Sequence, residues 1–146
     1  MHAKALLVLQ SMFLARVLGQ IVATLAGPAW LPEAKYWFSG ALPYPLLLPA
    51  QIVLLMYMSL VTYDAWRREG YWNVSRPATQ GILRKIAVVY FAAMVLRYVV
   101  TMALVPELRW TGHAIPIFFH FVLATYILVL SLPAEENATR TEMRHA

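Results

Sequence analysis

Hydrophobic positions fall in four long stretches that are separated by polar, proline-rich connections. The stretches run over residues 5–26, 46–63, 82–105 and 115–132. Each is close to the ~20 residues that an α-helix needs to cross ~30 Å of hydrocarbon. None shows the alternation of a β-strand, and a helix pairs its own backbone groups. The pattern predicts an all-α integral membrane protein, an antiparallel bundle of four transmembrane helices in a single domain, residues 1–146.

Proline residues lie at the boundaries of these stretches. Pro106 and Pro133 directly follow the third and fourth stretches. Pro49 and Pro116 are expected in the first turns of their helices, where the missing N–H costs little. The first connection, residues 27–45, contains four prolines and several aromatic residues. We expect this connection to lie at the outer membrane surface as a rigid, semi-buried cover.

Composition agrees with a membrane protein. The chain is 61% hydrophobic and 13% charged, whereas about a quarter of the residues of a soluble domain are charged. The formal net charge is +5, but the basic residues lie beside apolar stretches, so lipid head groups are the expected partner and nucleic acid is not. The chain has no cysteine, which excludes disulfides, thiolate catalysis and cysteine-bound zinc.

The distribution of basic residues predicts the orientation. The middle connection, residues 64–85, carries a basic cluster formed by Arg67, Arg68, Arg76, Arg84 and Lys85. The first and third connections each carry one basic and one acidic residue. Short connections rich in Lys and Arg stay in the cytoplasm. The middle connection, the N-terminus and the polar tail, residues 133–146, are therefore predicted to be cytoplasmic, an N-in/C-in topology.

Two arginines lie near the middle of apolar stretches, Arg16 in the first and Arg97 in the third, and none of the four stretches contains Asp or Glu. Even a lenient insertion scale gives a cost of ~3 kcal/mol for each such arginine. Ionisable residues at this depth normally face the bundle and have a partner. Gln20 shares the helix face of Arg16, and Tyr90 shares that of Arg97, because residues three, four or seven apart lie on one face.

Gln51 and His120 lie about two turns from the outer ends of the second and fourth stretches. We therefore expect a group of polar side chains to converge in the outer half of the bundle. The candidate ligand-binding residues are Arg16, Gln20, Gln51, Tyr90, Arg97 and His120. Two interpretations stay open. The arginines bond carbonyls, amides and hydroxyls of the bundle, or their counter-charge comes from a lipid phosphate, a cofactor, a quinone oxygen or a partner chain.

The sequence predicts neither a metal site nor catalysis. His113 and His120 are seven residues apart, whereas two helical ligands of one metal ion lie three or four residues apart. No nucleophile with a base, no Gly-rich phosphate loop and no HExxH run is present. The protein is therefore expected not to be an enzyme. The sequence contains no feature that requires a cofactor, and a bound phospholipid or quinone is compatible with it.

Three segments carry a resemblance to a known group of proteins. They are "LPYPLLLPAQ" before the second stretch, "YFAAMVLRY" in the third and "IPIFFHFVLATY" in the fourth. In these segments the chain resembles small uncharacterised four-span bacterial inner-membrane proteins. The resemblance implies a multi-pass protein of the bacterial inner membrane and brings no activity with it.

Two functions are compatible with these features. The first is a non-catalytic accessory or scaffolding subunit of a larger inner-membrane complex of respiratory or photosynthetic type. In such a complex, membrane lipids and other membrane-protein subunits would be its partners, and the arginines would engage an anionic lipid, a cofactor or a partner. The alternative is an independent membrane module that binds a lipid or a quinone. A small transporter or a haem protein is a less favoured function. A proton-coupled transporter usually carries an intramembrane acid, and the four apolar stretches contain none.

Overall fold

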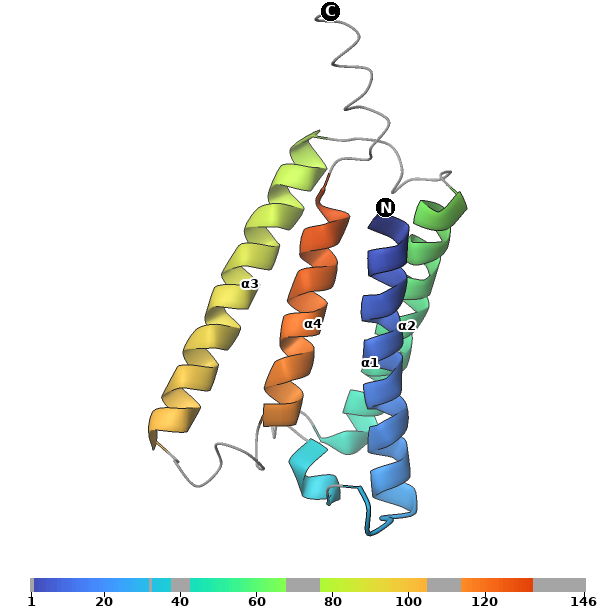
Figure 1. The fold of residues 1–146 in the computed structure, drawn as a ribbon, viewed down its shortest axis with the longest axis vertical. Coiled ribbons are helices and arrows are strands. Elements are labelled where there is room, and N and C mark those ends of the chain that lie inside the picture. Colours follow the sequence, from blue (N-terminus) through green and yellow to red (C-terminus); the bar gives the residue numbers. More distant parts are fainter. Residues whose placement is uncertain (1, 32, 38–42, 68–76, 105–113, 133–146) are drawn as a thin grey trace, which may run out of the picture.

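The computed structural model describes residues 2–31, 33–37, 43–67, 77–104 and 114–132, and over these ranges the chain is all-helical. The helices are, in chain order, α1 (His2–Leu25), the 3₁₀ helix η1 (Ala34–Trp37), α2 (Tyr44–Arg67), α3 (Pro77–Leu104) and α4 (Ala114–Leu130). Consecutive α-helices run antiparallel, as Figure 1 shows. We call the end where α1 begins and α4 ends the inner end, and the opposite end the outer end.

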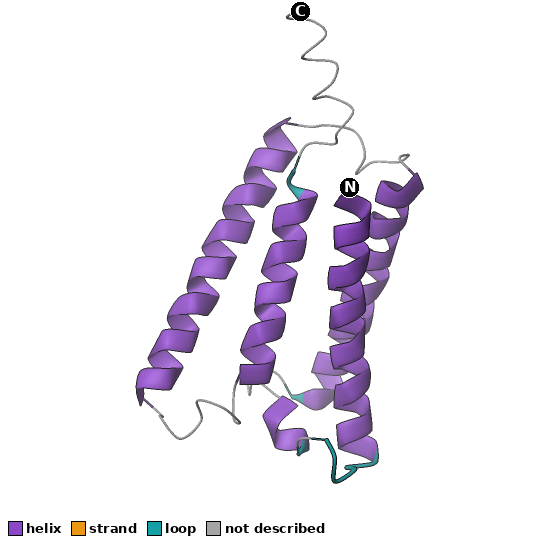
Figure 2. Ribbon diagram, in the orientation of Figure 1, coloured by secondary structure: helices purple, strands orange, loops and turns teal. Residues whose placement is uncertain are grey.

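Three of the helices are long and apolar enough to cross a membrane, namely α1, α2 and α3. The fourth, α4, is apolar but has 17 residues, the lower limit of the ~17–25 that membrane-crossing helices use. The predicted all-helical architecture is confirmed for the described residues, which form helices and short loops only (Figure 2). The predicted cytoplasmic tail, residues 133–146, lies outside the described residues.

Each of the four α-helices begins before its predicted apolar stretch. Helix α2 begins at Tyr44, so Pro49 is its sixth residue, and the prediction that Pro49 lies in the first turn was wrong. The helix starts earlier because Pro45 fits its second position, where no backbone N–H is needed. The N–H groups of Leu46 and Leu47 then donate to the carbonyl of Pro43, each at 3.0 Å. Pro116, the third residue of α4, does lie in a first turn.

The four α-helices pack in the spatial order α2, α1, α4, α3. Helix α1 packs against both α2 and α4, and α3 packs against α4. Among the described residues, α2 and α3 do not form a packed pair. Helix η1 packs against α1 and α4 near the outer end of the bundle (Figure 1).

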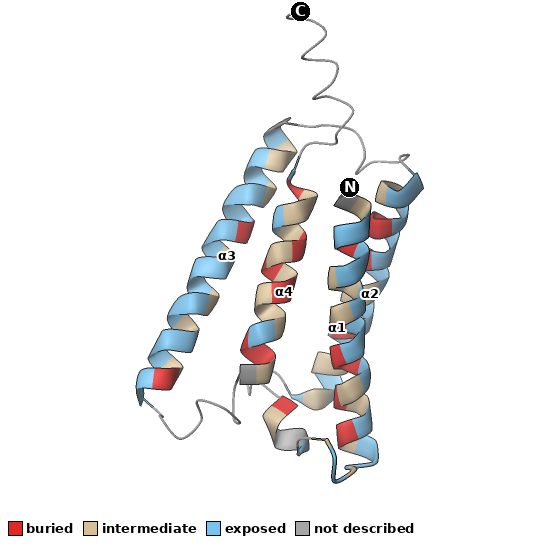
Figure 3. Ribbon diagram, viewed as in Figure 1, coloured by how far each residue is buried: buried red, intermediate tan, exposed pale blue. Residues whose placement is uncertain are grey.

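Helix α3 is the most exposed of the four, and most of its less exposed residues lie on one stripe. Their spacing of three or four residues gives a single face of a helix. Figure 3 shows that nearly all the rest of α3 is exposed. The stripe continues from the inner to the outer part of α3 through Leu83, Ala87, Tyr90, Met94, Arg97 and Thr101. Since α4 is the helix on which α3 packs, Arg97 lies on the side of α3 that faces the bundle.

A core of buried side chains extends from the inner end of the bundle to the level of the cavity. It is formed by Leu6, Phe13, Val17, Met58, Val61 and Tyr126. The hydroxyl of Tyr126 donates to the carbonyl oxygen of Met58 at 2.9 Å and lies 3.0 Å from the hydroxyl of Thr62. These two bonds connect α4 with α2, and they pair both buried hydroxyls.

Candidate functional site

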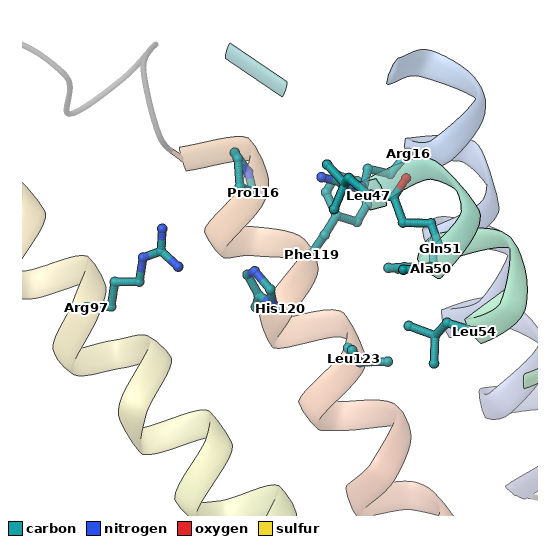
Figure 4. Close-up of a pocket in the computed structure, with 11 residues that line it drawn as sticks. Arg16, Leu47, Ala50, Gln51, Leu54, Arg97, Pro116, Phe119, His120 and Leu123 are labelled. Carbon is teal, nitrogen blue, oxygen red and sulfur yellow. The ribbon is translucent and has the colours of Figure 1, made fainter. Parts of the chain in front are cut away.

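A cavity of about 260 Å³ lies in the outer half of the bundle, and all four α-helices contribute to its wall (Figure 4). Each helix supplies one polar or charged side chain: Arg16 from α1, Gln51 from α2, Arg97 from α3 and His120 from α4. The other lining residues are apolar, namely Phe13, Leu47, Ala50, Leu54, Pro116, Phe119 and Leu123. The cavity is thus an apolar hollow with four polar groups.

The four polar residues meet because they lie at similar depths. Arg16 is nine residues from the outer end of α1, and Gln51 is seven from that of α2. Arg97 is seven residues from the outer end of α3, and His120 is six from that of α4. At 1.5 Å per residue they lie about 9–14 Å below the outer helix ends. The predicted convergence of these side chains is therefore seen in the structure.

Arg16 is the most deeply buried charge of the site. Its relative exposure is 7%. One terminal nitrogen, Nη2, donates to the backbone carbonyl of Trp37 at 3.2 Å, and the guanidinium carbon lies 5.8 Å from the centroid of the Phe119 ring. The Nε–H of Arg16 has no hydrogen-bond partner. Arg16 is therefore fixed from two sides but keeps a donor that is buried and unused.

Gln20 and Gln51 form a bond between α1 and α2. The Nε2 of Gln51 donates to the Oε1 of Gln20 at 3.3 Å. Both residues are buried, and the Oε1 of Gln51 and the Nε2 of Gln20 have no partner. A buried polar atom without a partner costs about 1–3 kcal/mol. Gln51 lines the cavity, although its Oε1 is itself enclosed by protein atoms.

Tyr90 and His120 connect α3 with α4. The hydroxyl of Tyr90 lies 2.5 Å from the Nδ1 of His120, and the two rings meet edge to face. In the tautomer in which Nδ1 accepts from Tyr90, the Nε2–H of His120 is a donor for the cavity that the ring lines. Tyr90 itself is not among the lining residues. Its contact with the site is through the imidazole that it orients.

Arg97 reaches the cavity from the helix that lies farthest from α1. Its side chain extends from α3 towards α4 and His120 (Figure 4). Together with Arg16 it gives the cavity two formal positive charges, and none of the described lining residues is acidic. The described lining of the site is therefore basic.

One contributor was not predicted from the sequence as part of the site. Trp37 was expected only as part of the outer cover, yet it is buried and its carbonyl oxygen binds Arg16. Its ring rests on Gly19 of α1, where an added Cβ would lie 2.6 Å and 2.9 Å from two ring carbons. A glycine on the Arg16 helix, with a tryptophan in the following connection, is the signal that could have pointed to this contact.

The residues of the predicted basic cluster lie away from the cavity or outside the described residues. In the basic cluster, Arg67, Arg84 and Lys85 are helical and exposed, and Arg67 lies 4.9 Å from the centroid of the Tyr63 ring. Arg68 and Arg76, like His113, lie outside the described residues. The predicted role of the cluster at a membrane surface stays a prediction.

The chemistry of the cavity suits binding of an anion or an oxygen-rich group. Guanidinium N–H groups and an imidazole N–H donate to acidic oxygens, and charge-assisted bonds of this kind are about twice as strong as neutral ones. Within the described part of the chain, no three His, Cys, Asp or Glu side chains are grouped so that they could hold a metal ion.

Comparison with known proteins adds no relative. No protein-family model, no curated protein and no solved structure matches the chain. The resemblance to small four-span inner-membrane proteins therefore stays a prediction, and the function has to be argued from the cavity itself.

Proposed function

We propose that this protein is a non-catalytic membrane protein whose outer cavity binds the acidic head group of an amphiphilic molecule. The observation that carries the proposal is a pair of buried polar atoms without a partner on two residues that line one cavity. These atoms are the Nε–H of Arg16, a donor, and the Oε1 of Gln51, an acceptor, and both are enclosed by protein atoms. A head group with both an acidic oxygen and a hydroxyl or acid proton would pair with both once the two side chains turn toward the cavity.

The cost of burying charge supports an anionic occupant. A guanidinium in a hydrocarbon environment is unfavourable by ~3 kcal/mol or more, and a carbonyl oxygen and an aromatic face compensate Arg16 only in part. An acidic group beside Arg16 would supply the missing charge, and Arg97 and His120 would donate to its other oxygens.

The membrane topology belongs to the same proposal. We infer four crossing helices in a bacterial inner membrane, with the inner end of the bundle in the cytoplasm because the basic cluster flanks that end. A reporter fused after Ala146 or inserted near Gly70 should read cytoplasmic, and one inserted near Ser39 should read periplasmic. A cytoplasmic signal at Ser39 would contradict the orientation.

A second candidate function is that of an accessory subunit in a larger membrane complex. The observation that favours it is the exposure of α3, whose only packed neighbour among the described helices is α4. Lipid tails or the helices of a partner would cover that face. The two candidates differ in what leaves the membrane with the protein, a small amphiphile or other polypeptides.

The test is the mass of the protein extracted from native membranes in mild detergent, with Arg16→Gln and Arg97→Leu as variants. We expect a co-purified acidic amphiphile on the unmodified protein, and at least tenfold less of it on each variant. Lys4→Gln is the charge-matched control, because Lys4 is an exposed residue of α1 outside the cavity. It should retain the ligand.

Three outcomes separate the interpretations. Loss of the ligand from both arginine variants, with the helices still inserted, supports the binding function. A protein that always leaves the membrane with other polypeptides and without a small ligand supports the accessory subunit. If the variants are unstable but retain everything that the unmodified protein carries, the arginines are structural and the proposal is wrong.

A further inference from the structure

The arrangement of the helices around the cavity leaves one side without a packed helix pair. Helices α2 and α3 both line the cavity, but among the described residues they pack on α1 and α4 respectively and not on each other. Ala50 of α2 is exposed although it lines the cavity. The wall between α2 and α3 is thus the side on which the cavity meets the surroundings of the bundle.

The outer end is more closed. Helix η1 packs against α1 and α4, and its Trp37 is buried and bonded to Arg16. A molecule that came straight down the bundle axis beside Arg16 would have to displace this contact. A molecule that came from the side, between α2 and α3, would leave it intact.

The size of the cavity limits what it can enclose. Pockets that enclose whole drug-sized ligands are about 300–1,000 Å³, and this cavity has about 260 Å³. It has room for a head group and the first atoms attached to it. Long hydrocarbon chains would remain outside, where the apolar lining residues Leu47, Ala50 and Leu54 of α2 continue into a membrane-facing surface.

We propose that the ligand is a membrane lipid with a small acidic head group, a phosphate or a carboxylate, that reaches the cavity sideways from the bilayer between α2 and α3. This inference rests on the proposed function. The head group lies between Arg16, Gln51, Arg97 and His120, about 10 Å below the outer helix ends. The chains stay in the bilayer between the two outer helices.

The occupant is a lipid rather than a soluble anion for two reasons. A free phosphate would make no favourable contact with the apolar part of the lining, and only four of the lining residues are polar or charged. A soluble anion would also have to cross apolar surface to reach a group this deep, whereas a lipid slides along that surface on its own chains. A neutral quinone would leave the buried guanidinium of Arg16 without an acidic group beside it.

The test compares four probes on delipidated protein in detergent, with binding measured by native mass spectrometry. The probes are dioleoyl phosphatidic acid, dioleoylglycerol, inorganic phosphate and decylubiquinone. Phosphatidic acid has both an acidic head group and acyl chains. Dioleoylglycerol lacks the acidic group, and inorganic phosphate lacks the chains. We expect phosphatidic acid to bind at least tenfold more tightly than the other three, and Arg16→Gln to remove that preference.

Each outcome addresses a different claim. If inorganic phosphate competes as well as phosphatidic acid, the acid-binding function stands and the lipid is overturned. If dioleoylglycerol binds as well as phosphatidic acid, or decylubiquinone binds more tightly, the acidic head group and with it the proposed function are overturned. This comparison of probes on the unmodified protein does not depend on the folding of any variant.

The sideways route has its own variant. Ala50→Trp places a large ring at the exposed part of the cavity wall, and we expect it to weaken phosphatidic acid binding at least tenfold. Ala92→Trp is the matched control, because Ala92 is an exposed alanine of α3 outside the cavity. If Ala50→Trp, folded as judged by circular dichroism, binds phosphatidic acid as the unmodified protein does, access between α2 and α3 is overturned.

Discussion

The two halves of the bundle use the same helices in opposite ways. Towards the inner end, Tyr126 of α4 gives its hydroxyl to the carbonyl of Met58 and pairs with Thr62, and apolar residues of α1, α2 and α4 surround the group. In the outer half, α1 and α2 bury Arg16 and Gln51, each with an atom that has no partner. The hydroxyls of the inner core are paired, although the Oε1 of Gln10 in the inner half of α1 has no partner. The outer cavity differs in having two lining residues, Arg16 and Gln51, with unpaired buried atoms.

This difference distinguishes buried polar groups that are paired within the protein from buried polar groups that a bound ligand could pair. Buried polar groups in proteins are nearly always paired, so a buried donor and acceptor left over in one cavity need an explanation. The inner pair shows that this chain can pair buried hydroxyls fully. An occupant of the outer cavity would explain the unpaired atoms of Arg16 and Gln51, but not the Oε1 of Gln10, which lies outside the cavity.

Shortening Met58, which is 1% exposed, should have the largest effect on stability. Met→Ala in a protein core costs about 2–5 kcal/mol, and we expect Met58→Ala to be near 2 kcal/mol because lipid tails are as apolar as the side chain, so mainly packing is lost. Met56→Ala, at an exposed position of the same helix, should change little. Unfolding in a titration with sodium dodecyl sulfate measures both. Ligand loss in Met58→Ala at full folding would contradict the separation of the two halves.

An added methyl group at Gly19 should act on the cavity through Trp37. The new Cβ would lie 2.6 Å from a ring carbon of Trp37, and such overpacking typically costs about 1–3 kcal/mol. Since Trp37 holds Arg16, Gly19→Ala should also weaken ligand binding. Gly81→Ala is the control, because nothing lies within 4 Å of its added Cβ. Equal ligand content and stability in the two variants would show that the Trp37 contact is dispensable.

Removing the hydroxyl of Tyr126 should give a smaller loss of stability. Tyr126→Phe removes both of its bonds, and polar bonds between membrane helices are worth on average about 0.6 kcal/mol, with a maximum near 1.7. We expect a loss of about 1 kcal/mol in the same titration and an unchanged ligand. Tyr98→Phe, at an exposed position of α3, should be neutral. A variant that lost ligand as well would connect the inner core with the site.

Replacing Gln51 should have the smallest effect on stability and a selective effect on binding. Gln51→Leu removes an unpaired buried oxygen but leaves the buried Oε1 of Gln20 without its 3.3 Å donor. Because these two effects oppose each other, the free energy of unfolding should change by less than about 0.5 kcal/mol. Gln10→Leu is the control, because Gln10 also bonds α1 to α2, through Ser59 at 2.7 Å, but lies outside the cavity. Only Gln51→Leu should lower ligand content; equal effects would assign both glutamines to helix packing.

The sequence predicted the helices and the members of the site better than the details of their contacts. Length and apolarity are enough for the helices, and antiparallel helices place residues of similar depth together, so Arg16, Gln51, Arg97 and His120 could be grouped in advance. The contact of Trp37 with Gly19 could not be predicted, because it depends on how a non-helical connection folds back. The start of α2 at Tyr44, which makes Pro49 its sixth residue, was not predicted, because the start of a helix depends on its capping residues and not on the apolar stretch alone.

A crystal structure of the protein extracted with its native lipids would show whether an acidic group occupies the outer cavity. We expect density for a phosphate or carboxylate with an oxygen within about 4 Å of the Arg16 guanidinium, continuous with a chain between α2 and α3. An outer cavity that holds only water, with the Nε of Arg16 bonded to another group of the protein, would contradict this expectation.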